Sequence, residues 1–164
     1  MNFIDEAYLE VRAGDGGSGA SSFRREKYIP FGGPDGGDGG KGGNILFKVN
    51  QNTNTLIDFQ NKKIFEAKNG QKGSGKNKSG ADGDDLVIHI PKGTVIYDNL
   101  TNEELMDCTD EDYEYLIVKG GEGGHGNARF KSATNRAPRK STPGFKGEVR
   151  SLRLELKSLA DVGL

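Results

Sequence analysis

The sequence predicts an all-β fold, a small barrel or sandwich, that carries long glycine-rich loops. Short segments in which apolar and polar residues alternate recur along the chain, and none keeps a 3.6-residue apolar period over the length of a helix. Of the 26 glycines, 24 lie in residues 13–43, 61–84 and 119–147. Because the chain is only 32% hydrophobic, the segments between these loops must supply its core.

Eight segments have the composition of strands. The clearest is residues 86–90, where Leu86, Ile88 and Ile90 fall on one face. Residues 55–59 are ambiguous and are compatible with a helical turn. In chain order the expected strands are residues 3–11, 44–49, 63–67, 86–90, 94–97, 104–107, 113–118 and 149–159.

The glycine-rich segments are expected to form polyproline II helices packed side by side. Disorder is the alternative, because ordering a residue costs about 1–2 kcal/mol and glycine costs most. Residues 36–43, however, place a side chain on every third residue, and a polyproline II helix has three residues per turn. Two of its three edges would then be bare backbone, on which neighbouring segments can pack. Extended in this way, residues 13–43 would project by about 45 Å at ~3.1 Å per residue.

The charge is partitioned in the same way as the glycines. The three glycine-rich segments carry 17 Lys and Arg against 8 Asp and Glu, whereas the rest of the chain carries 6 against 16. A net charge of −1 therefore conceals an acidic body and basic loops. This distribution favours a polyanionic partner that meets the loops first.

Two segments resemble nucleotide-binding loops but lack the required context. Residues 70–77 match the P-loop except that Asn77 stands where Ser or Thr ligates magnesium, and no apolar strand leads into them. Residues 121–126 match the dinucleotide-binding fingerprint, but the residues that follow lack a helical period. We interpret both matches as coincidences of glycine-rich sequence.

The chain offers neither a metal-ligand set nor a nucleophile with its base. Cys108, His89 and His125 are too few and too scattered for zinc or a catalytic triad. The acidic residues at 82–85, and Asp35 with Asp38, lack EF-hand spacing, so we interpret them as solvated turn carboxylates. A lone cysteine suits a reducing, cytoplasmic compartment, and no apolar run approaches the ~18 residues of a membrane span. The sequence predicts no catalysis, cofactor or metal site in this segment.

The basic residues of the loops are candidate RNA contacts. Arg and Lys on projecting backbone can contact phosphates, and the interleaved Phe23, Phe65 and Phe130 can stack on unpaired bases. A single basic cluster is usually a solvated face, but three clusters opposed by an acidic body favour nucleic acid. The candidate RNA-binding residues are Arg24, Arg25, Lys27, Lys62, Lys63, Lys76, Lys78, Arg129, Lys131, Arg136, Arg139 and Lys140.

Several longer motifs are highly specific when taken together. They are Ala13-Gly14-Asp15-Gly16-Gly17, residues 22–28 (SFRREKY), residues 32–43 (GGPDGGDGGKGG), Gly126-Asn127 with Arg129-Phe130, Asn135-Arg136-Ala137-Pro138-Arg139, and residues 154–164 (LELKSLADVGL). The chain resembles, over essentially its whole length, the amino-terminal domain of the Obg (CgtA) family of bacterial GTPases. Glu122 and His125 depart from that pattern, because these loop positions are often basic in the family.

The resemblance implies an eight-stranded barrel that carries glycine-rich loops of packed polyproline II helices. It implies that residues 1–159 are an Obg-type domain and that residues 160–164 begin a linker into a GTPase domain absent from this chain. That missing domain would bind GTP or GDP with magnesium and hydrolyse GTP slowly. The implied partners are the large ribosomal subunit and its rRNA, the GTPase domain itself, and a guanosine tetraphosphate synthetase or hydrolase.

Together these observations predict a non-catalytic domain that binds large-subunit rRNA in a GTPase of ribosome assembly and stress or growth control. A protein-interaction module is the first alternative, with Glu103, Asp110, Glu111 and Asp112 as its working surface. A structural protein with collagen-like self-association is the second.

Overall fold

The computed structural model describes residues 4–25, 32–132 and 135–157 of the chain. Within these residues no α-helix is present, and the eight expected strands are confirmed, with described ends shifted by at most one residue. Residues 158–159 of the last expected strand lie outside the described residues. The ambiguous residues 55–59 contain the 3₁₀ turn η1 (Ile57–Phe59), and a second turn, η2 (Asn127–Phe130), begins where no helical period was seen. Phe3 and the expected linker, residues 160–164, lie outside the described residues. The strands are β1 (Ile4–Arg12), β2 (Ile45–Val49), β3 (Ile64–Glu66), β4 (Leu86–Ile90), β5 (Thr94–Asp98), β6 (Glu104–Cys108), β7 (Glu114–Val118) and β8 (Val149–Lys157).

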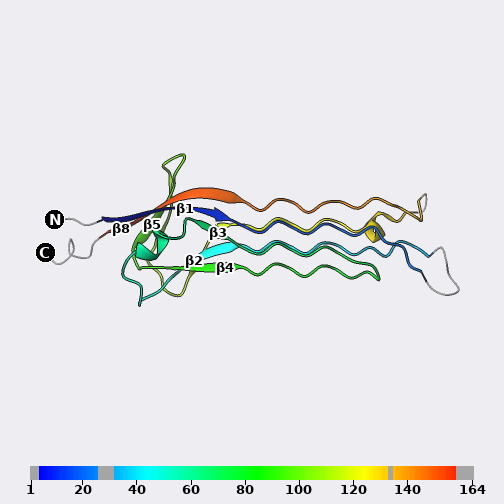
Figure 1. Ribbon diagram of the computed structural model, residues 1–164, viewed down its shortest axis with the longest axis horizontal. Helices are drawn as coiled ribbons and strands as arrows, with labels where there is room; N and C mark the ends of the chain where they lie inside the picture. Colours follow the sequence, from blue (N-terminus) through cyan, green and yellow to red (C-terminus); the bar gives the residue numbers. More distant parts are fainter. Residues whose placement is uncertain (1–3, 26–31, 133–134, 158–164) are drawn as a thin grey trace.

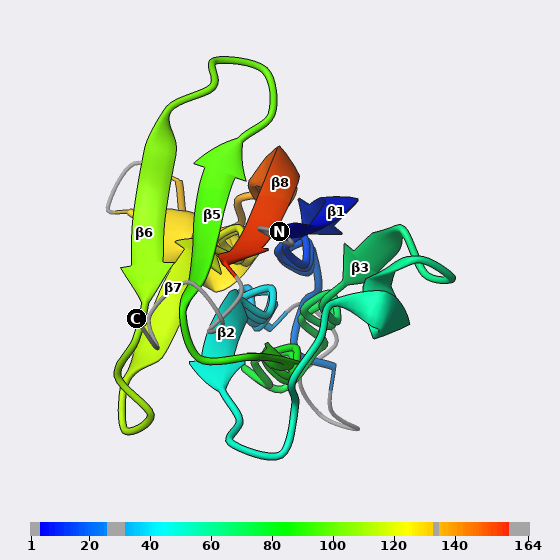
Figure 2. The ribbon, with the colours of Figure 1, turned by 90° about the vertical axis from the view of Figure 1, so that its left-hand side faces the viewer.

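Two sheets form the barrel at one end of the molecule (Figure 1). The larger sheet has the order β3-β1-β8-β5-β6 and curves around the smaller one, β4-β2-β7, as the view along the long axis shows (Figure 2). Most neighbours are antiparallel, but β1 pairs with β3 and β2 with β4 in parallel. These pairs are parallel because β1 and β3 both lead into a glycine-rich loop, whereas β2 and β4 both return from one.

The alternating apolar residues of the strands meet between the two sheets. Ile45, Phe47 and Val49 of β2 are all buried, and so are Leu152 and Leu154 of β8. The residues between them, such as Lys48 and Arg153, are half-buried on the opposite face, as the two-residue period of a strand requires. Each fully buried Leu, Ile or Phe side chain contributes about 1.5–3 kcal/mol, so this core is the main stabilising element of the barrel.

The glycine-rich loops extend from the barrel as an array of six extended segments (Figure 1). The first loop (residues 13–43) contributes segments 13–22 and 34–43, the second (67–85) segments 67–75 and 78–85, and the third (119–148) segments 119–127 and 138–148. Each segment continues directly from, or into, a strand of the barrel, so the strands fix the positions at which the segments start. The prediction of a packed polyproline II array is confirmed.

Backbone hydrogen bonds with a repeat of three residues hold the array together. The N–H groups of Gly14, Gly17 and Ala20 donate to carbonyls of segment 34–43, at 2.8, 2.8 and 2.9 Å. Other bonds in steps of three join segments 34–43 and 67–75, and segments 119–127 and 13–22. Because a polyproline II helix makes no internal hydrogen bonds, its backbone groups are available to neighbouring segments. The two segments of the first loop lie at the centre and bond to segments of both other loops.

Glycine is required in the array for close approach and not for backbone freedom. Among the described glycines only Gly93, in a turn of the barrel, has a positive φ, of 88°. A Cβ at Gly39 would lie 1.8 Å from the carbonyl oxygen of Gly17, and one at Gly42 would lie 1.9 Å from that of Gly14. Real Cβ atoms do not come within 3.0 Å of other heavy atoms. Any other residue would therefore push the segments apart.

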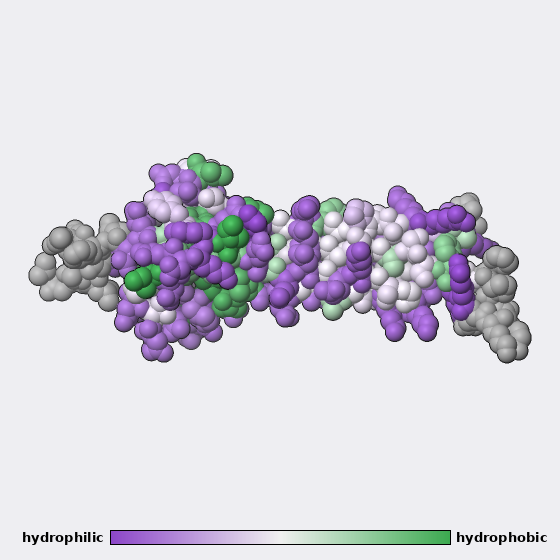
Figure 3. Space-filling view, in the orientation of Figure 1, coloured by the Kyte–Doolittle hydropathy of each residue, from purple (hydrophilic) through white to green (hydrophobic). Residues whose placement is uncertain are grey.

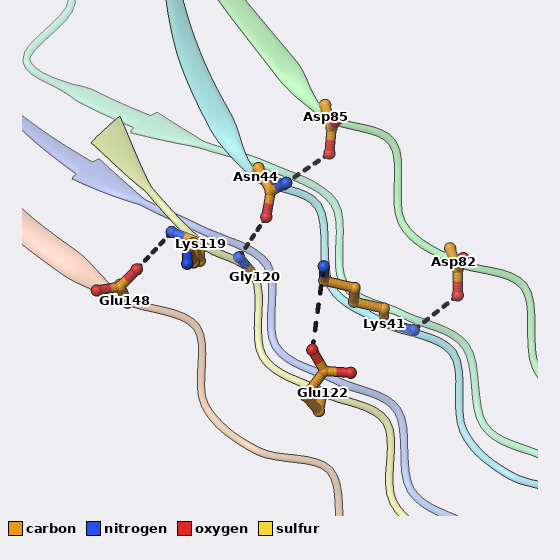
Figure 4. Close-up of polar contacts among 8 residues, drawn as sticks. All are labelled: Lys41, Asn44, Asp82, Asp85, Lys119, Gly120, Glu122 and Glu148. Carbon is orange, nitrogen blue, oxygen red and sulfur yellow. Dashed lines mark hydrogen bonds and ion pairs between the residues drawn. The ribbon is translucent and has the colours of Figure 1, made fainter. Parts of the chain in front are cut away.

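At the junction of barrel and array, where the glycines end, side chains form the hydrogen bonds between the loops (Figure 4). Asn44 binds in both directions, because its N–H donates to Asp85 and its Oδ1 accepts the Gly120 N–H, both at 2.8 Å. The N–H of Lys119 donates to Oε1 of Glu148 at 2.7 Å. These bonds tie the three loops to one another at their roots.

Candidate nucleic-acid interface

The tips of the three loops meet at the end of the array farthest from the barrel. Asp35 of the first loop accepts the Lys76 N–H of the second loop through Oδ2 at 3.0 Å. Asn127 of the third loop is fully buried, and its Oδ1 accepts the Gly36 N–H at 2.8 Å. Its Nδ2 donates to the Pro138 carbonyl at 3.1 Å, within the third loop. Asp35 and Asn127 thus join three loops into one surface, the distal end, defined as residues 20–25, 32–38, 74–79, 125–132 and 135–141.

Nine of the twelve candidate residues lie at the distal end, and all nine are exposed. Lys62 and Lys63 do not lie there, because they immediately precede β3 and sit at the barrel, where Lys62 Nζ lies 4.8 Å from the Phe65 ring centroid. Lys27 lies outside the described residues. The nine distal residues are Arg24, Arg25, Lys76, Lys78, Arg129, Lys131, Arg136, Arg139 and Lys140.

The charge is separated along the molecule. The distal end carries nine Lys and Arg against two carboxylates, Asp35 and Asp38. Residues 4–12, 44–66, 85–118 and 148–157, which build the barrel and its turns, carry 16 Asp and Glu against 8 Lys and Arg. Between these two regions most of the surface has intermediate hydropathy, and narrow hydrophilic bands cross it (Figure 3). The sequence-based picture of an acidic body with basic loops therefore becomes a separation between two ends.

Arg129 and Lys140 are distal cations that interact with other residues of the array. Arg129 donates to Asp38, with Nη2 and Oδ2 2.6 Å apart. Burial disfavours the charged form of Asp38, but the bonds from Arg129 and from the Gly126 N–H outweigh it and lower the pKa of Asp38. Lys140 Nζ lies 5.2 Å from the Phe130 ring centroid, a cation–π distance. Arg129 therefore combines a structural bond with an exposed guanidinium.

Glu122 and His125, the two residues that depart from the pattern of the resembled family, lie at different distances from the barrel. Glu122 lies nearer the barrel, where its carboxylate is 4.0 Å from Lys41 Nζ (Figure 4). Glu122 therefore reduces the positive charge of the array near the barrel and leaves that of the distal end unchanged. The ring of His125 lies at the distal end, 6.3 Å from that of Phe130.

The structure also explains the look-alike motifs. Residues 70–74 belong to an array segment, and Lys76 and Asn77 form the turn at the tip of the second loop. Residues 121–126 likewise lie in the array, and only the four-residue turn η2 follows them. Among the described residues, no three His, Cys, Asp or Glu side chains are grouped to hold a metal ion, and no helix could cross a membrane.

The interpretation of the acidic loop residues as solvated turn carboxylates was wrong in one respect. Asp35, Asp38, Asp82 and Asp85 each accept a backbone N–H from another segment, at 2.8–3.0 Å. Their side-chain oxygens thus join neighbouring segments, as backbone carbonyls do elsewhere in the array. A signal was present in the sequence, since Asp35, Asp38, Lys41 and Asn44 follow one another at intervals of three.

An all-β barrel whose strands continue into a six-segment polyproline II array defines a glycine-rich domain of the Obg type. The family model described as GTP1/OBG matches residues 4–158. The chain is 54% identical over 164 residues to the protein named GTPase Obg from Psychrobacter sp. (strain PRwf-1). The chain therefore belongs to the GTP1/OBG family. The match covers 100% of this chain and 41% of that relative, so the chain spans less than half of the relative's length.

Proposed function

We propose that this chain is the domain that binds the large ribosomal subunit, through its rRNA, in an Obg-type GTPase. The observation that carries this proposal is the placement of nine exposed cations at the free end of a projecting array, opposite an acidic barrel. Cations in this position can enter an RNA cleft that the barrel could not enter. The domain itself supplies recognition and no catalysis.

The array suits this role because it is long and internally bonded. Backbone hydrogen bonds between segments fix the loops before they meet RNA, so little ordering entropy remains to be lost on binding. The distal Arg and Lys side chains would contact phosphates, and Phe23 and Phe130 lie among them as stacking surfaces. The acidic barrel would be repelled by the same RNA, which orients the approach with the distal end first.

The remaining part of the function belongs to the parent protein. The relative that matches over the whole chain is named a GTPase, and this chain covers only part of its length. We propose that a further domain binds GTP or GDP with magnesium and hydrolyses GTP, and that the parent acts in large-subunit assembly and in stress and growth control. The cytoplasm is the compartment in which this partner would be met. A guanosine tetraphosphate synthetase or hydrolase is a further proposed partner of the parent.

Co-sedimentation with isolated large ribosomal subunits across a salt series tests the proposal. Arg136→Glu with Arg139→Glu should weaken binding by roughly tenfold or more, because two distal phosphate contacts become repulsive. The matched control is Lys62→Glu with Lys63→Glu, which makes the same change in charge at the barrel and should bind like the wild type. Binding should also fall steeply with salt, with a log–log slope of about −0.7 per phosphate contact for unpaired strands.

Two results would contradict the proposal. Equal loss in both double variants would mean that net charge matters and the distal end does not. Absence of binding at low salt would favour a protein-interaction module. The acidic turns around β6, which include Glu103, Asp110, Glu111 and Asp112, are the surface for that alternative, and they lie at the barrel.

A further inference from the structure

A pocket of about 650 Å³ opens at the distal end between the first and second loops. This is within the size range of small-molecule sites and is large enough for one nucleotide. Phe23 contributes a ring, and the surrounding groups include cations, amides and a carboxylate. The lining residues are Ser21, Ser22, Phe23, Arg24, Arg25, Asp35, Gly75, Lys76 and Asn77.

Asp35 is the unusual member of this pocket. The residue is 7% exposed, and its Oδ2 accepts the Lys76 N–H. Its backbone is also fully engaged, because the Asp35 N–H donates to Ser22 at 2.9 Å and its carbonyl accepts the Asn77 N–H at 2.7 Å. The other carboxylate oxygen, Oδ1, is buried and has no hydrogen-bond partner among the described residues. A buried acceptor without a donor is costly, and such groups in native proteins call for a functional explanation.

The part of the pocket that the second loop contributes, next to Asp35, is strained. Lys76 and Asn77 have φ angles of 61° and 57°, which lie in the left-handed region that residues other than glycine rarely adopt. Their N–H groups are the two that bind Asp35, at 3.0 and 2.7 Å. Backbone held in such a conformation by its surroundings clusters at ligand-binding sites. The free oxygen of Asp35 and the strained turn are thus parts of one arrangement.

We propose that this pocket receives one unpaired RNA nucleotide, whose base displaces the side chains that cover Asp35 Oδ1 and donates an exocyclic amino hydrogen to this oxygen. The inference rests on the proposed RNA-binding function and adds a base preference to it. Arg25 and Lys76 supply positive charge for the phosphate, and Phe23 supplies a ring for stacking. Extruded bases are read in this way, through stacking and hydrogen bonds to the edge that normally pairs.

The carboxylate predicts which bases the pocket accepts. Adenine, cytosine and guanine carry an exocyclic amino group that a carboxylate oxygen can accept. Uracil has no amino group, and its single N–H lies between two carbonyl oxygens that a carboxylate repels. The pocket therefore discriminates against uracil, a preference that phosphate contacts alone cannot produce.

Fluorescence anisotropy of the 164-residue chain with labelled single-stranded octamers of A, C and U tests this inference. The wild type should bind the A and C octamers about tenfold more tightly than the U octamer, the effect of one hydrogen bond to a charged group. Asp35→Asn keeps an oxygen for the Lys76 N–H and replaces the free oxygen by an amide NH₂, a donor that suits the carbonyls of uracil. Its discrimination should be lost or reversed.

Asp82→Asn is the matched control. It removes one negative charge from a carboxylate that also accepts a backbone N–H, that of Lys41 at 2.8 Å, outside the pocket. It should retain the wild-type preference. Gly75→Val is an independent variant that fills the pocket. Among the described residues, a Cβ there would meet the movable Ser22 hydroxyl at 2.9 Å and would lie 3.8 Å from Asp35 Oδ1. It should weaken A and C binding to the level of U, and it decides the question should Asp35→Asn not fold.

Equal wild-type affinity for the three octamers, or a preference that survives Asp35→Asn and Gly75→Val, would overturn the inference. The proposed function fails by a different result. If the octamers show the preference but large subunits do not bind, the base pocket stands and the ribosomal assignment falls. If subunits bind and the octamers show no preference, the reverse holds.

Discussion

The barrel and the array are built from one chain but are held together by different forces. In the barrel, apolar side chains such as Phe47, Ile45 and Leu154 are removed from water between two sheets. The array lacks such a core and is stabilised by hydrogen bonds between backbones that glycine allows to approach closely. The array must also overcome the entropy of ordering glycine, which is the largest of any residue.

The difference shows how a protein can project charge without a hydrophobic core at the tip. An array of bare backbones is narrow, because two of the three edges of each central segment carry no side chain. The barrel provides the starting register for all six segments, and Asp35 and Asn127 join the loops again at the far end. The array is thus fixed at both ends and filled between them by repeating bonds.

Replacing Phe47 by Ala should produce the largest effect, and it should not distinguish the two regions. The side chain is fully buried in β2, which receives the central segment 34–43 of the array. The cavity should lower the free energy of unfolding by about 3–5 kcal/mol. Amide hydrogen exchange resolved by residue should accelerate in barrel and array together. Unchanged protection in the array would mean that it holds its register without the barrel.

Replacing Gly39 by Ala should separate the two regions. The new Cβ would lie 1.8 Å from the Gly17 carbonyl oxygen, so the two central segments must part. We expect a loss on the order of 3 kcal/mol in the stability of the array, comparable to overpacking a core. Exchange should accelerate at the array amides, for example those of Gly17 and Gly124, while the amides of β1 and β8 stay protected.

Gly33 provides the control for this substitution. Among the described residues, a Cβ at Gly33 would meet no atom closer than the Lys131 Nζ, at 3.7 Å. Gly33→Ala should therefore be neutral or should stabilise by about 0.4–1 kcal/mol, through loss of freedom in the unfolded chain. If Gly33→Ala and Gly39→Ala were equally harmful, backbone freedom would be the reason for the glycines and close approach would not.

The sequence predicted the features that neighbouring residues determine, and it missed the contacts between residues of different loops. All eight strands were found because alternation is a property of neighbouring residues, and the interval of three in residues 36–43 indicated polyproline II. The pairing of segments was not predictable, because any glycine-rich segment offers the same bare backbone to any other. Asn127 and Asp35 were missed for this reason, since each acts on a residue of another loop. Lys62 and Lys63 were grouped with the loops by composition, although β3 begins at Ile64.

Acid should produce the smallest effect, and it should act differently on the two regions. Asp38 lies between segments of two loops, and although burial opposes it, the bonds from Arg129 and the Gly126 N–H lower its pKa. In the barrel, the bonds from the N–H groups of Thr101 and Leu100 lower the pKa of Asp98. A lowered pKa in the folded state means that each group stabilises the fold above its unfolded value, near 3.8, and that this contribution disappears as pH falls through the folded value.

Below about pH 4, where both carboxylates become protonated, the barrel and the array should therefore respond differently. Asp98 caps a turn of its own strand connection and pairs with Arg150 of β8, so its protonation should loosen contacts within the barrel only. Protonation of Asp38 should instead release a bond between loops and raise exchange at Gly126. Asp38→Asn should remove the acid dependence at Gly126 and leave that at Leu100 intact, and Asp98→Asn should do the reverse. NMR titration of these two amides measures both. Acid dependence at Gly126 that persists in Asp38→Asn would mean that another carboxylate holds the loops together at the distal end.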